Sequence, residues 1–211
     1  MNAKESMKIS GRTYAVLALV LSLTPGCITE PDSLTDDASN TIVQIVNMGA
    51  SDADFEGAGD TVTDLFSDVC FADEDHPPCT IFNDNGVVTM RAIPKDRTQL
   101  SGEMNAATFT RYRVTYVRAD GRNVQGVDVP YSFDGAINFT VPFGGDDVER
   151  AFIVVRHQAK AETPLRELAL GARAGILSVI AQIDFFGADT AGRSIHVTGY
   201  LNITFADFGN E

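Results

Sequence analysis

The sequence predicts an all-β protein, an antiparallel β-sandwich of about eight strands with one short helix. Apolar and polar residues alternate with period two in several segments after residue 41, which is the pattern of half-buried strands. Clusters of Gly, Asp and Asn separate these segments, as turn residues do between paired strands. The chain has 211 residues, of which 44% are apolar, so it is long enough to bury one substantial core.

The clearest alternation covers residues 195–205, where Ile195, Leu201 and Phe205 share one face with other apolar residues. Gly199 interrupts that face, and we expect a β-bulge there. The same pattern predicts strands over 109–118, 136–141, 151–157, 176–186 and 195–205, with weaker ones over 41–47, 62–70, 86–93 and 124–129.

One segment has helical character. Thr163 is a suitable N-cap and Pro164 suits the first helical position, while Leu165 and Leu168 fall on one side. We expect about two turns of helix that cross between the sheets. The turn sequences at 120–123 and 187–192 predict hairpins between neighbouring strands.

The first residues read as an export signal. Lys4, Lys8 and Arg12 precede the apolar run 14–21, and the uncharged stretch 13–25 is too short to span a bilayer. Met7 is an alternative start, because a signal that begins there omits the acidic Glu5.

Gly26 and Cys27 end this signal, and here the chain resembles a bacterial lipoprotein. In that family a small residue precedes a Cys that receives lipid and becomes the first mature residue. This sequence departs from the usual pattern at Thr24, where the family has Leu. The alternative is an ordinary secretory signal that leaves Cys27 as a spare thiol. The resemblance implies an exported protein of the cell envelope, and Ile28 after the Cys favours the outer membrane.

The predicted organisation is a signal peptide at 1–26, an acidic tether at 27–40 and a β-sandwich domain at 41–211. The tether is polar and acidic, with no apolar period.

Of the three cysteines, one follows the predicted signal and two lie in the predicted domain. If Cys27 carries lipid, Cys70 and Cys79 remain to form a disulfide, which export to an oxidising compartment favours. A loop of about ten residues closed in this way gains roughly 2.5–3 kcal/mol in the chain-entropy model. A zinc site with Cys70, His76 and Cys79 is the alternative, because thiolates and imidazole are zinc ligands.

The acidic residues between these cysteines raise a second metal possibility. Asp73, Glu74 and Asp75 carry oxygen ligands of the kind that calcium prefers. Adjacent acids do not have the alternate spacing of a calcium loop, so further ligands are needed. They would come from a set of acids elsewhere in the chain, namely Asp84, Asp134, Asp146, Asp147 and Asp189. We expect no cofactor, with calcium as the alternative.

Charge and motifs exclude several classes of function. Residues 1–26 hold three basic residues and one acidic residue, so the net charge goes from −13 to −15 when they are removed. Such a chain is a poor ligand for nucleic acid. No Gly-x-Ser-x-Gly or His-Glu-x-x-His motif is present, and we do not expect an enzyme. Arg111, Arg113 and Arg118 are expected to pair with acids on neighbouring strands.

The last predicted hairpin, 176–205, resembles that of immunoglobulin-like domains in bacterial surface proteins. The chain departs from antibody domains because it has no Trp, and because Cys70 and Cys79 are too close in sequence to join two sheets. From the signal, the predicted fold and the motifs together, we expect a lipid-anchored, non-enzymatic accessory or interaction domain at the cell surface or in the periplasm. Its expected partners are the membrane, through the N-terminal lipid, and another surface protein or a glycan. The alternative is a calcium-assisted carbohydrate-binding module.

Overall fold

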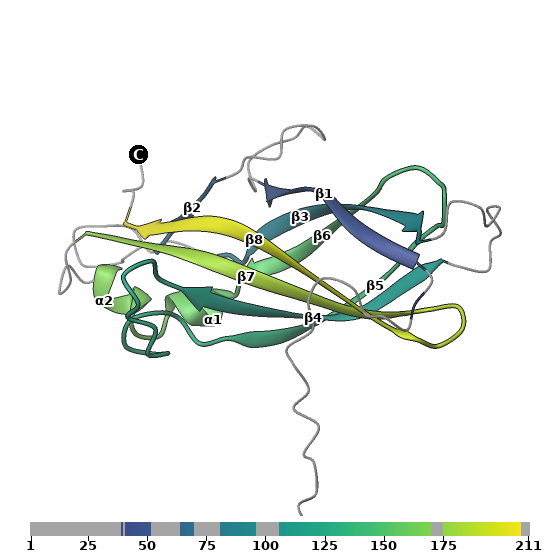
Figure 1. Ribbon diagram of the computed structural model, residues 1–211. Helices are drawn as coiled ribbons and strands as arrows, with labels where there is room; N and C mark the ends of the chain where they lie inside the picture. Colours follow the sequence, from purple (N-terminus) through teal and green to yellow (C-terminus); the bar gives the residue numbers. More distant parts are fainter. Residues whose placement is uncertain are drawn as a thin grey trace, which may run out of the picture. The chain divides into compact units, whose positions relative to one another are not determined.

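The computed structural model describes residues 39, 41–51, 64–69, 81–95, 106–169 and 175–207, all of which lie in one compact unit, Asp32–Glu211. Eight strands form two sheets, and Figure 1 shows them with two small helices beside one end. The strands are β1 (Thr41–Ser51), β2 (Asp64–Asp68), β3 (Asp84–Pro94), β4 (Ala107–Val117), β5 (Phe133–Val141), β6 (Val148–Val155), β7 (Ile176–Asp189) and β8 (Ser194–Ala206).

One sheet has the order β1-β3-β6 and is antiparallel. The other has the order β2-β8-β7-β4-β5, and β2 runs parallel to β8 while the remaining pairs are antiparallel. The predicted all-β sandwich is confirmed, but the larger sheet is mixed and not purely antiparallel. A parallel pair needs a long connection, and almost the whole domain separates β2 from β8.

The core lies between the sheets and is rich in aromatic rings. Tyr112 on β4, Phe152 on β6 and Phe185 on β7 pack together, with ring centroids 5.3 to 6.2 Å apart. The Tyr116 hydroxyl donates a hydrogen bond of 2.7 Å to the carbonyl of Val154. Because β4 and β6 belong to different sheets, this bond joins the two layers.

The alternation over 195–205 is confirmed, but the bulge at Gly199 is not. The pairing of β7 with β8 is unbroken from the Ile176–Ala206 pair to the Ala188–Ser194 pair. A Cβ atom at Gly199 would instead overlap the side chains of Met48 and Ile45 on β1. The glycine therefore permits a close approach of the two sheets.

The predicted strand 124–129 is wrong. These residues form a turn in which Gly126 has a φ of 76°, a conformation that interrupts an extended strand. The strand predicted over 151–157 is β6, which begins earlier, at Val148, and ends at Val155.

The described residues contain two helices where one was expected. The predicted one is α2 (Leu165–Ala169), and the second is α1 (His157–Lys160), a single turn directly after β6. Thr163, the predicted cap, donates its hydroxyl proton to the carbonyl of Gly126, outside the helix. Among the described residues, no helix is long and apolar enough to cross a membrane.

Candidate functional site

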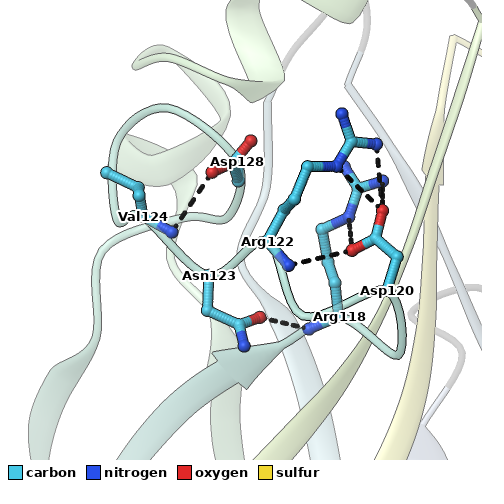
Figure 2. Close-up of polar contacts among 6 residues, drawn as sticks. All are labelled: Arg118, Asp120, Arg122, Asn123, Val124 and Asp128. Atoms are coloured by element: carbon cyan, nitrogen blue, oxygen red, sulfur yellow. Dashed lines mark hydrogen bonds and ion pairs between the residues drawn. The ribbon is translucent and has the colours of Figure 1, made fainter.

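The connection from β4 to β5, residues 118–132, begins with a compact group of charges. Both Arg118 and Arg122 contact the carboxylate of Asp120, with Nη2–Oδ2 distances of 2.6 and 2.9 Å (Figure 2). The hydrogen bond from Arg118, and then that from the Arg122 amide, lower the pKa of Asp120 to about 2. The acid therefore stays ionised and fixes the turn at any neutral or mildly acidic pH.

The second half of this β4–β5 loop is held by its own backbone. The carbonyl of Val124 accepts from the amides of Val127 and Asp128, at 3.1 and 2.7 Å, and the amide of Gly126 donates to Val129. Figure 2 also shows the Asp128 carboxylate accepting from the Val124 amide at 3.3 Å. Such a density of local bonds gives the loop one defined shape.

The loop uses this shape to present apolar side chains to solvent. Val124, Val127 and Tyr131 are 60%, 57% and 48% exposed. The two valines flank one turn, and the Tyr131 hydroxyl lies where a Cβ atom of Gly126 would be. Single exposed apolar residues are ordinary, but a group of three on a rigid loop is typical of a contact surface.

A polar network occupies the outer face of the five-stranded sheet. Asp184 on β7 is buried, and its carboxylate accepts from the Thr198 hydroxyl at 2.7 Å and from the Gln182 amide at 3.1 Å. Nε2 of His196 lies 3.2 Å from the same carboxylate. The acid is thus satisfied by its neighbours on β7 and β8.

Beside this network, Phe186 lies between two side chains. The His196 ring stacks on it with centroids 4.8 Å apart, and the Arg111 guanidinium lies 4.2 Å from its centroid. Arg111 and Arg113 both contact Asp134 on β5, at 3.3 and 2.8 Å. The prediction that these arginines pair with acids on a neighbouring strand is confirmed, whereas Arg118 pairs within its own turn.

A third polar group lies in the interior. Nζ of Lys160 on α1 is 2.8 Å from Asp84 on β3, and the side chains are only 4% and 16% exposed. The fully buried Ser67 on β2 donates to the same carboxylate at 2.6 Å. Burial raises the pKa of Asp84, although Lys160 and Ser67 oppose that shift. Three distant segments are joined here, out of reach of a large substrate.

Ser39, the first described residue, is held in place by hydrogen bonds. The Ser39 hydroxyl donates to the buried carboxylate of Asp189 at 3.0 Å. That carboxylate further accepts from the amides of Ala191 and Arg193, at 2.9 Å each. Burial opposes ionisation, but the hydrogen bonds prevail and lower the pKa of Asp189. The chain before β1 is thus attached to the β7–β8 turn.

The predicted site residues Cys27, Cys70, Asp73, Asp75, His76 and Cys79 lie outside the described residues, so the lipidation, disulfide and metal predictions stay predictions. Four of the acids that might have completed a calcium site have other partners; they are Asp84, Asp134, Asp147 and Asp189. Within the described ranges, no group of three His, Cys, Asp or Glu side chains is placed to hold a metal ion.

Sequence reasoning did not identify the β4–β5 loop as a surface. Val124 and Val127 fit the alternation of the strand expected over 124–129, and the Asp-Gly turn marks the start of the loop. Comparison with known proteins adds no assignment, because no family model and no curated protein matches the chain.

Proposed function

We propose that the chain is an exported, lipid-anchored interaction domain without enzymatic activity, and that it binds a protein partner through the β4–β5 loop. The observation that carries the proposal is the group of exposed apolar side chains at Val124, Val127 and Tyr131 on a loop fixed by hydrogen bonds. A rigid surface loses little conformational entropy on binding, which favours recognition.

The strand order supports an immunoglobulin-like arrangement. In such sandwiches strands G, F and C share a sheet, and the variable type adds C′. The neighbours β8-β7-β4-β5 occupy corresponding places, opposite the smaller sheet β1-β3-β6. In that arrangement the β4–β5 loop is the C–C′ connection, one of the loops gathered at an end of the sandwich.

A non-enzymatic role is supported by the state of the described polar groups. Ser67 and Lys160 contact Asp84 but are buried. His196 and Thr198 are both bonded to Asp184, on one face of the five-stranded sheet. These contacts fix strands to one another, which is a structural task.

Site-specific photocross-linking tests the binding surface. A photoreactive amino acid at Val124, in cells that produce the protein naturally, should yield one discrete adduct. Substitution of Val127 by Asp in the same chain should reduce its yield, because the charge disrupts the apolar contact. The matched control places the photoreactive group at Ala151, which is exposed on β6. Equal adducts at both positions, or a yield that Val127→Asp does not alter, would contradict the proposal.

The anchor has a separate test. Cys27→Ser should move the protein from the membrane fraction to the soluble fraction and remove the mass of the lipid. If fractionation and mass both stay the same, the protein is not anchored through this residue, whatever the loop binds.

A further inference from the structure

The outer face of the five-stranded sheet contains an open groove of about 450 Å³ that lies over β2, β8 and β7 and extends to Ala119, at the start of the β4–β5 loop. It is distinct from the apolar group on the β4–β5 loop. The strand register places two rows of side chains across its floor. One row is Asp64, Asn202 and Ile180, and the other is Phe66, Thr204 and Ser178.

The middle of the groove is polar but neutral. The hydroxyls of Ser178 and Thr204 lie 3.4 Å apart, and either one is able to donate to the other. Nδ2 of Asn202 donates to Asp64 at 3.1 Å, which leaves the amide oxygen available as an acceptor. The floor therefore offers hydroxyl and amide groups that both donate and accept.

Apolar side chains stand at opposite corners of this floor. Phe66 on β2 is 66% exposed, and Ile180 on β7 is 37% exposed. With strands about 4.8 Å apart and about 3.3 Å per residue, the floor measures roughly 10 by 7 Å. That area matches a ligand of a few rings with apolar faces and a rim of hydroxyls.

Charge narrows the ligand class. The described residues that line the groove include no cationic side chain, and Asp64 is the one ionisable group among them. Without residues 1–26 the chain has a net charge of −15, and this negative charge repels anionic polymers. The groove therefore favours a neutral, polyhydroxylated ligand.

We infer that this groove binds a neutral oligosaccharide, with two or three sugar rings over β2, β8 and β7. The ring faces pack against Phe66 and Ile180, and the hydroxyls bond to Asn202, Thr204 and Ser178. No part of this contact set needs calcium, so the inference differs from a calcium-assisted module and does not rest on the loop proposed above.

Titration of the protein with cellohexaose, maltohexaose and chitohexaose, each to millimolar concentration, tests the inference by NMR. We expect at least one sugar to shift the backbone amides of residues 178–180 and 202–204, and EDTA to leave its affinity unchanged. Ser178→Arg places a long charged side chain over the floor and should weaken binding by about tenfold or more. Asn138→Arg adds the same charge to the exposed side of β5 and should change affinity less than about twofold.

Several results would overturn the inference. These are no shift with any of the three sugars, shifts confined to residues 120–132, loss of binding in EDTA, or equal affinities for the two arginine variants. Concentration-dependent dimerisation that Ser178→Arg abolishes would assign the groove to a second copy of the chain. Melting curves for both variants check that each one is folded.

Discussion

Lys160→Met removes one partner of the buried ion pair and keeps most of the apolar stem. The side chains of Lys160 and Asp84 are 4% and 16% exposed, so solvent screens the pair poorly. Loss of one partner from such a pair costs about 3–5 kcal/mol, because the other charge stays buried without compensation. In a domain of this size, 1 kcal/mol shifts Tm by about 2–4 °C, so the variant should melt roughly 6–20 °C lower at pH 7.

The stability lost in Lys160→Met should depend on pH in a defined direction. Burial raises the pKa of Asp84 in the folded protein, so ionisation of this carboxyl opposes folding as pH rises through that pKa. Without Lys160 the opposing attraction is lost, and the pKa rises further. Below the unfolded pKa of about 3.9, Asp84 is neutral and the wild-type lysine is the unpaired charge. The difference in free energy of unfolding between wild type and Lys160→Met should therefore become smaller as the pH falls from 7 to 4.

Urea denaturation followed by far-ultraviolet circular dichroism measures these free energies, since the chain has no Trp for fluorescence. Asp84→Asn with Lys160→Met removes both charges and should recover more than half of the loss. Arg91→Met breaks an exposed pair with Asp147 and is the control, with little expected effect. Asp84→Asn is also measured alone. The pair is not coupled if the losses of Asp84→Asn and Lys160→Met add to that of the double variant within about 0.5 kcal/mol, or if the loss in Lys160→Met is the same at pH 7 and pH 4.

Two further predictions concern the contacts between the sheets. Gly199→Ala should lose about 1 kcal/mol in the same assay, because the flexible ends of the Met48 and Ile45 side chains must move away from its Cβ, whereas Gly175→Ala, which meets open space, should stay near wild type. Equal losses would contradict the close approach. Tyr116→Phe should lose about 1–2 kcal/mol, because the Val154 carbonyl remains buried without its donor. An unchanged midpoint for Tyr116→Phe would mean that this bond contributes nothing net.

The alternation of residue types predicted most strands because each sheet has one face in the core and one in water. In β8 the faces differ at nearly every position, from Ile195 to Phe205, and tertiary packing agrees with the local preference. The same pattern failed at 124–129. There Gly126 and the side chain of Asp128 supply local hydrogen bonds that an extended strand cannot make.

Other features depend on contacts that no local pattern contains. Lys160 and Asp84 are 76 positions apart, and nothing near either residue predicts their pairing. The helix α1 has only four residues, too few to give a helical period. The exposure of Val124, Val127 and Tyr131 depends on the shape of the β4–β5 loop. The cysteines and acids at 70–79 were notable by composition alone.

The bond between Ser39 and Asp189 has a consequence for orientation. Ala107 at the start of β4 pairs with Asp189, and Val117 at its end pairs with Ile180, so the β4–β5 loop and the β7–β8 turn lie at opposite ends of β4. Twelve positions separate Cys27 from Ser39, and a chain of that length reaches about 43 Å at most. A lipid on Cys27 would therefore be joined to the domain at the end of β4 that is remote from Val124 and Val127.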